Sequence, residues 1–145
     1  MAKIMSFFVL FLSISHFSIA QNLIKVNSPI NVNVAANEAI DDTFKSFSVT
    51  WTAEQNIRGY EIFLQIEESR TISFICNPAI SHVSTSDIYG AIIDNAALER
   101  RKLIPNDRRW RIGVRCKGKI NNNTRTSNPS DIVWSAYTSI NLPIQ

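Results

Sequence analysis

The chain has 145 residues and a formal net charge of +3, and its length fits one domain with a sizeable core. It contains only two histidines, two cysteines and four glycines. This inventory argues against a zinc site and against a glycine-rich phosphate loop. We therefore expect no bound metal and no cofactor.

The first twenty residues have the pattern of a secretory signal peptide. Lys3 supplies a basic start, residues 4–12 form an apolar run, and Ser18 and Ala20 place small residues where signal peptidase cleaves. The run is shorter than the roughly 20 residues of a membrane-spanning helix. We expect cleavage after Ala20, a polar lead-in over residues 21–28, and a secreted protein without membrane insertion.

From residue 29 onward, apolar and polar residues alternate with a period of two. The runs cover residues 30–34, 46–52, 60–67 and 109–117. Runs with one apolar face predict antiparallel sheets packed face to face, so the fold class is all-β. A helical period is weak and confined to residues 95–102.

Five landmarks in order resemble those of fibronectin type III domains. They are a strand ending at Trp51, a strand starting at Gly59-Tyr60, the turn at residues 103–106 (LIPN), the strand at residues 110–114 (WRIGV), and residues 127–130 (SNPS) before the last strand. The resemblance covers residues 29–140. It implies an immunoglobulin-like β-sandwich of about seven strands with fibronectin type III topology, a domain over residues 29–141 and a tail at 142–145. Trp110 stands where that family has a tyrosine, and residues 76–102 do not follow its pattern.

Cys76 and Cys116 form an even pair, which in a secreted protein predicts a disulfide bond. In the family's topology another strand separates the two strands that carry them. The bridge therefore requires one cysteine to lie past its strand, because the Cα atoms must come within about 7 Å. Asn122, in Asn122-Asn123-Thr124, is the one N-glycosylation acceptor without a blocking proline.

Positive charge is concentrated in one part of the chain. Ten of the fifteen basic residues lie between Arg100 and Arg125, where only Asp107 opposes them. If Trp110, Ile112 and Val114 face the core, strand parity puts a row of basic side chains on the outer face. The candidate binding residues are Arg109, Arg111, Arg115, Lys117 and Lys119, with Phe63 as an aromatic anchor on the neighbouring strand.

Two interpretations of these basic residues compete. In the first, Glu61 and Glu67 on the neighbouring strand form cross-strand ion pairs with the arginines and neutralise them. In the second, the excess of arginine binds an anion, such as a sulfated glycan or an acidic protein surface. Nucleic acid is disfavoured by secretion and by the lack of an aromatic ladder for base stacking.

The sequence contains no convincing catalytic set. His82, Asp87 and one of the serines could be combined into a Ser–His–Asp catalytic set, but no nucleophile-elbow motif supports it. Our main hypothesis is a monomeric, non-enzymatic binding or adhesion module whose partner is an extracellular protein or a sulfated glycan. The alternatives are a secreted effector or antigen that resembles the fibronectin-type antigens of larval flatworms, and a decoy or inhibitor that resembles a receptor ectodomain.

Overall fold

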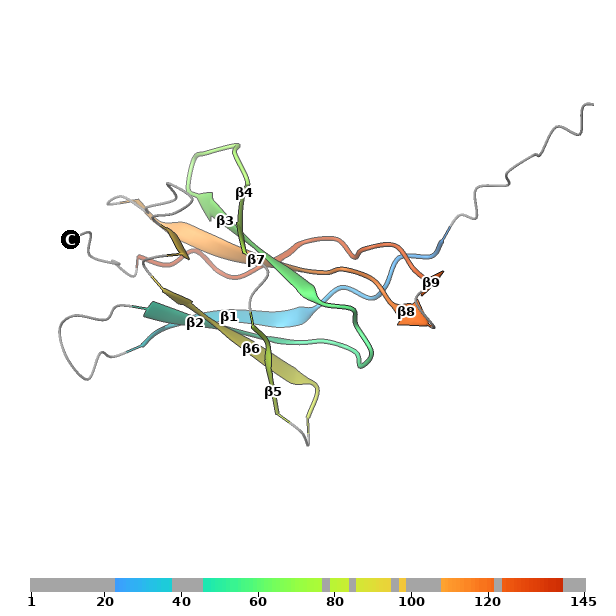
Figure 1. Cartoon of the computed structure of the whole chain (residues 1–145). Helices are drawn as coiled ribbons and strands as arrows, with labels where there is room; N and C mark the ends of the chain where they lie inside the picture. The colour runs from blue at the N-terminus through green and yellow to red at the C-terminus, as the bar shows by residue number, and fades with distance from the viewer. Residues whose placement is uncertain are drawn as a thin grey trace, which may run out of the picture.

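A computed structural model of the chain describes residues 23–37, 46–76, 79–83, 86–94, 97–98, 108–121 and 124–139. It is all-β, with two antiparallel four-stranded sheets and a separate two-stranded hairpin (Figure 1). The strands are β1 (Ile30–Asn37), β2 (Ser46–Thr52), β3 (Tyr60–Ile66), β4 (Ser73–Cys76), β5 (Ser81–His82), β6 (Ile88–Asp94), β7 (Trp110–Cys116), β8 (Ile120–Asn121), β9 (Thr124–Arg125) and β10 (Val133–Trp134).

The sheets are assembled from strands that are not neighbours in the sequence. One has the order β1-β2-β6-β5 and the other the order β10-β7-β3-β4, while β8 and β9 form the hairpin. The four predicted alternating runs form β1, β2, β3 and β7. In each strand the apolar side chains can be buried on one face while the polar side chains lie on the other.

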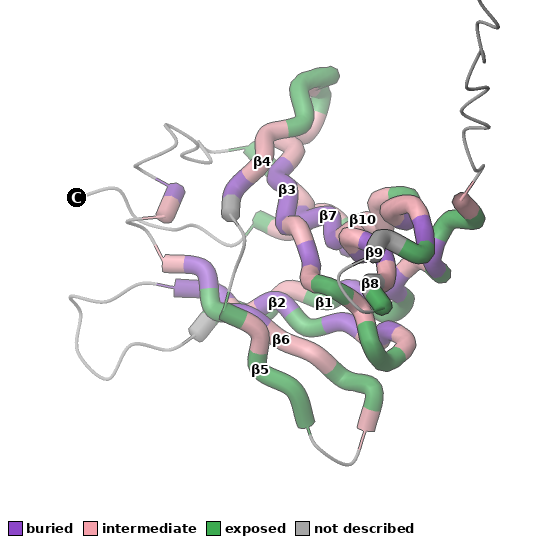
Figure 2. Tube along the Cα trace, turned by 45° about the vertical axis from the view of Figure 1, so that its right-hand side comes forward, coloured by how far each residue is buried: buried purple, intermediate pink, exposed green. Residues whose placement is uncertain are grey.

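The core lies between the two sheets and is built from the inward residues of each strand. Figure 2 shows buried stretches on β2, β3 and β7, whereas the end of β5 is exposed. The largest fully buried side chains of the core include Trp51, Trp110, Phe47, Ile62, Leu64 and Ile112. Phe47 of β2 and Trp110 of β7 touch across the core, with ring centroids 4.9 Å apart.

Three buried serines join the last segment of the chain to β7 and the residues after it. The hydroxyl oxygens of Ser127, Ser130 and Ser135 accept hydrogen bonds from the backbone N–H groups of Lys119 (2.7 Å), Cys116 (3.0 Å) and Ile112 (3.1 Å). These hydroxyls satisfy donors that a regular ladder would pair with carbonyls. The short strand β10, paired through Val133 and Trp134 with Val114 and Gly113, is thereby held at both ends.

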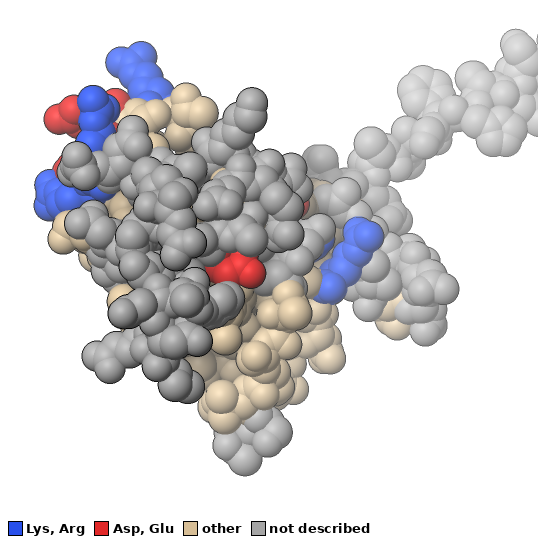
Figure 3. All heavy atoms as spheres, turned by 60° about the vertical axis from the view of Figure 1, so that its left-hand side comes forward, with Lys and Arg blue, Asp and Glu red and all other residues tan. Residues whose placement is uncertain are grey.

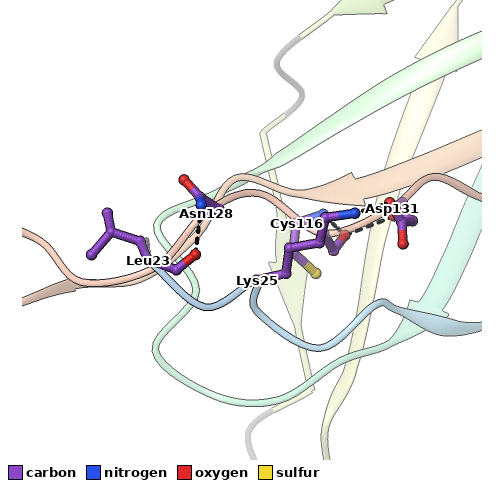
Figure 4. A network of polar contacts seen from close by, with 6 residues as sticks. Leu23, Lys25, Cys116, Asn128 and Asp131 are labelled. Atoms are coloured by element: carbon purple, nitrogen blue, oxygen red, sulfur yellow. Dashed lines mark hydrogen bonds and ion pairs between the residues drawn. The ribbon is translucent and has the colours of Figure 1, made fainter. Parts of the chain in front are cut away.

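The described residues of the predicted lead-in, 23–28, are part of the packed domain. Val26 is only 6% exposed and belongs to the core, and its N–H donates to the carbonyl of Asn128 (3.0 Å). Asn128 in turn donates through its side-chain amide to the carbonyl of Leu23 (2.6 Å), and Lys25 pairs with Asp131 (2.6 Å; Figure 4). Residues 23–28 therefore lie along the segment that precedes β10.

Residues 95–102 have the weak helical period, and the structure describes two of them, Ala97 and Leu98. Ala97 and Leu98 are helical, the Ala97 N–H donates to Asp94 Oδ1 (2.7 Å) as at a helix N-terminus, and Leu98 is buried. No helix in the described parts of the chain is long and apolar enough to span a membrane. The predicted signal peptide, the turn at residues 103–106, Asn122 and the tail at 142–145 lie outside the described residues, as does the side chain of Cys76.

Candidate binding surface

The outer face of the β10-β7-β3-β4 sheet carries most of the predicted site residues. In the register of β3 and β7, Glu61 lies opposite Arg115 and Gln65 lies opposite Arg111. The alternate residues Ile62, Leu64, Ile112 and Val114 are buried in the core. Strand parity therefore placed the arginines of β7 on the outer face correctly.

Two of these arginines have carboxylate partners. Arg115 pairs with Glu61 at 2.5 Å, and Arg109 forms a two-pronged pair with Glu67 through Nε and Nη2. The bonds to Glu67 raise the pKa of the Arg109 guanidinium. Both are the cross-strand pairs predicted from the sequence, and both reduce the positive charge of the face.

Arg111 differs because its hydrogen-bond partner is uncharged. Its Nε and Nη2 donate to Gln65 Oε1 at 2.9 and 2.6 Å. Its guanidinium lies 4.7 Å from the ring centroid of Trp134 and 4.8 Å from that of Tyr137. The positive guanidinium thus lies over two aromatic rings, an attractive arrangement that holds the side chain in place.

The sequence interpretation missed Trp134 and Tyr137. Both are half-buried and come from the last segment of the chain, more than twenty residues after Arg111. Trp134 lies opposite Gly113 in the register of β10 and β7, which brings its ring beside the arginine row. The signal that could have found them is the presence of two aromatic residues three positions apart beside the strand that carries the arginines.

Phe63 is not the exposed anchor that we expected. It points outward by parity but is only 8% exposed. Phe74 of β4 packs against it edge-on with ring centroids 5.7 Å apart, and the Arg115 guanidinium lies 5.1 Å from its ring centroid. The Phe63 ring instead packs beneath the guanidinium of Arg115.

The two predicted lysines lie beyond the end of β7. Lys117 donates its backbone N–H to the carbonyl of Gly59 (2.8 Å). Lys119 pairs with Glu54 (2.5 Å) in a shallow depression of about 210 Å³ that is also lined by residues 24–27. Lys119 therefore belongs to a separate part of the surface, away from Arg109, Arg111 and Arg115.

Cys116 carries a buried free thiol, which corrects the expectation of a Cys76–Cys116 disulfide. Cys116 lies opposite Tyr60 on one side of β3, and Cys76 lies opposite Ile62 on the other side. Two strand spacings separate the cysteine backbones by about 10 Å, more than the roughly 7 Å that a disulfide can span. Burial raises the pKa of the Cys116 thiol to about 11.

The buried thiol predicts a loss of stability at alkaline pH. The unfolded thiol ionises near pH 9 and the folded thiol near pH 11, so a rising pH favours the unfolded state that has released its proton. Through this group the free energy of unfolding should be about 1 kcal/mol lower at pH 10 than at pH 8. Urea unfolding of the wild type and of Cys116→Ala at both pH values measures it. Burial also raises the pKa of Tyr60, which both proteins retain, so an equal pH dependence in the two would contradict the prediction.

His82 and Asp87, the two residues of the Ser–His–Asp combination that the structure describes, each have a different side-chain partner. His82 is exposed on β5 and stacks on Tyr89 with ring centroids 4.5 Å apart, while Asp87 accepts a hydrogen bond from Gln55 (3.3 Å). No cluster of three or more His, Cys, Asp or Glu side chains among the described residues could hold a metal ion.

Comparison with known proteins found no matching family model, no matching curated protein and no matching solved structure.

Proposed function

We propose that the chain is a secreted, non-enzymatic binding module that recognises an extracellular protein through the outer face of the β10-β7-β3-β4 sheet. The observation that carries the proposal is the layer formed by Arg111, Trp134 and Tyr137. Arg, Trp and Tyr are the residue types that contribute most binding energy in protein interfaces. Here they are half-buried and already packed together, so little conformational freedom remains to be lost on binding.

The charges of this face favour an acidic group on the partner. Arg109 and Arg115 are paired with Glu67 and Glu61, but the partner of Arg111 is the neutral amide of Gln65. The positive charge of Arg111 is therefore uncompensated by its nearest neighbour. A carboxylate placed beside its guanidinium would gain a charge-assisted hydrogen bond at the centre of the aromatic layer.

The arrangement of the strands supports fibronectin type III or immunoglobulin-like topology as the finer description of the fold. If the strands outside the β8-β9 hairpin are lettered in chain order, with β4 as C′, the sheets become ABED and GFCC′. Immunoglobulin-like sandwiches divide their strands in this way. Secretion is proposed on the basis of the basic start, apolar run and small-residue exit of residues 1–20.

Binding to cell surfaces tests the proposal. We expect the labelled domain to bind a cell-surface protein, and Trp134→Ala or Tyr137→Ala to weaken binding at least about tenfold, as hot-spot residues do. Thr50→Ala, an exposed position on the opposite sheet, is the matched control and should bind as the wild type does. Circular dichroism confirms that each variant is folded. Unchanged binding by the folded Trp134→Ala, Tyr137→Ala double variant would refute this surface.

Chromatography on heparin distinguishes a protein partner from a sulfated glycan. Because two of the three arginines on the face have carboxylate partners, we expect elution from heparin at the same salt concentration as from a sulfonate cation exchanger. Later elution from heparin, lost in the double variant Arg111→Glu, Arg115→Glu, would instead assign the face to sulfated glycans.

A further inference from the structure

Gln65 is the neutral member of a row of polar side chains that bind the arginines of the candidate surface. Each of the three arginines on or next to β7 bonds to one residue of β3 or of the turn after it: Arg115 to Glu61, Arg109 to Glu67 and Arg111 to Gln65. Two of these partners are carboxylates and the third is an amide. The face therefore carries two ion pairs, each neutral as a pair, and one arginine whose charge its bonded neighbour does not offset.

The Gln65 amide joins two groups that a carboxylate could not join. Its Nε2 donates to the carbonyl oxygen of Ser69 (3.0 Å), and its Oε1 accepts from Nε and Nη2 of Arg111 (2.9 and 2.6 Å). The Ser69 carbonyl is part of the turn at residues 66–69, which the bond from the Ser69 N–H to the Ile66 carbonyl closes (3.0 Å). Because a carbonyl oxygen only accepts and a guanidinium only donates, these two bonds fix which way the amide points.

The fixed amide holds the Arg111 guanidinium while leaving part of it for a partner. The bonds to Gln65 use two of the five N–H groups of the guanidinium, so three can donate to another acceptor. The ring centroids of Trp134 and Tyr137 lie 4.7 and 4.8 Å from the guanidinium carbon. A carboxylate that bonds to Arg111 therefore comes beside aromatic rings, where a charge-assisted hydrogen bond is stronger than in water.

The neighbouring charges favour a partner with one acidic group over a polyanion. On both sides of Arg111 the next arginine is already paired with a glutamate. In Figure 3 the basic side chains at the upper left of the view likewise lie next to acidic ones. A second negative charge on the partner would therefore meet a neutral pair and gain little net attraction.

We propose that Gln65 is a positioning residue that determines the specificity of this surface: its amide orients Arg111 and leaves the charge of Arg111 to a single carboxylate on an apolar part of the partner. The inference rests on the proposed function, because it names the group that the surface recognises. In Gln65→Glu the new carboxylate would offset Arg111 as Glu61 and Glu67 offset their own arginines, and an acidic partner would lose its attraction.

Retention on two resins of equal carboxylate density tests this role without the partner. One resin carries benzoylglycine coupled through its ring, so that each carboxylate stands beside an apolar group, and the other carries carboxymethyl groups. The wild type should elute from benzoylglycine at a higher salt concentration than from carboxymethyl, and Gln65→Glu should lose most of this difference. Thr50→Glu changes the net charge equally at an exposed position on the opposite sheet and should keep the difference. Gln65→Met removes the amide without adding charge and should keep a reduced difference.

Binding of the labelled domain to cells is the second measurement. Gln65→Glu should bind at least about tenfold more weakly than Thr50→Glu, the loss expected when a hydrogen bond to a charged group is removed. Circular dichroism checks that each variant is folded.

Three results would overturn the role of Gln65. The wild type could elute from both resins at the same salt concentration, or Gln65→Glu could behave as Thr50→Glu does. Gln65→Met could lose as much retention as Gln65→Glu, which would make the amide a purely structural link between Arg111 and the turn. Failure of the proposed function is seen separately, because the Trp134→Ala, Tyr137→Ala double variant would then bind cells as the wild type does, while the resins would still decide the role of Gln65.

Discussion

Replacing Trp110 by alanine is expected to lower the free energy of unfolding by about 3–5 kcal/mol, the usual cost of removing a large buried aromatic side chain. Trp110 is only 1% exposed and packs against Phe47 of the opposite sheet. The lost ring would leave a cavity between the sheets that the surrounding strands cannot close. This loss is a large part of the roughly 5–15 kcal/mol by which domains are stable.

Urea unfolding measures this loss, and Trp134→Ala is the matched control. Trp134 is half-buried on the outer face, where its ring lies beside the Arg111 guanidinium, so its removal should cost only about 1 kcal/mol. A cost for Trp110→Ala no larger than that for Trp134→Ala would contradict the position of Trp110 in the core. The same comparison tests whether Trp110 has an inward packing role.

The alternating strands could be predicted because the period of two is a local property. Phe47, Val49 and Trp51 on β2, like Ile62 and Leu64 on β3, have inward positions that follow from the alternation alone. The Arg115–Glu61 and Arg109–Glu67 pairs could also be predicted, once β3 and β7 were taken as antiparallel neighbours. Local pattern therefore determined most of the sheet that carries the candidate surface.

What could not be predicted depends on contacts between distant segments. Strand parity predicted that Phe63 points outward. It could not predict that Phe74 and Arg115 pack against the Phe63 ring and bury it. The stack of Arg111 with Trp134 depends on the register of β10, which is held at its ends by serine hydroxyls instead of an apolar pattern.

The disulfide between Cys76 and Cys116 was wrongly predicted for the same reason, because it too depends on how distant segments are placed. Two cysteines in an exported chain predict a bridge only if the fold brings them together, and composition contains no information on distance. β3 lies between β4 and β7 in the sheet, and this separates Cys76 from Cys116. The inward direction of Cys116, by contrast, followed from its place in the alternating run.

Gly113→Ala is expected to lower the free energy of unfolding by about 2–3 kcal/mol, as overpacking of a well-packed site does. A Cβ atom on Gly113 would lie 2.5 Å from Ile132 Cγ2 and 2.8 Å from two ring carbons of Trp134, closer than carbon atoms can approach. The glycine leaves the space in which the Trp134 ring crosses β7 and reaches Arg111. The substitution must therefore push Trp134 off the strand.

Gly90→Ala on β6 is the matched control for Gly113→Ala. A Cβ atom there would lie 3.5 Å from the carbonyl oxygen of Val49, an ordinary contact, so this change should be neutral or stabilising by up to about 1 kcal/mol. Urea unfolding of both variants gives the difference, and equal effects would contradict the close approach of Trp134 to β7. Because Gly113→Ala displaces Trp134 from Arg111, it should also weaken partner binding, whereas Gly90→Ala should not. A folded Gly113→Ala protein that still binds fully would show that recognition does not need the stacked arginine.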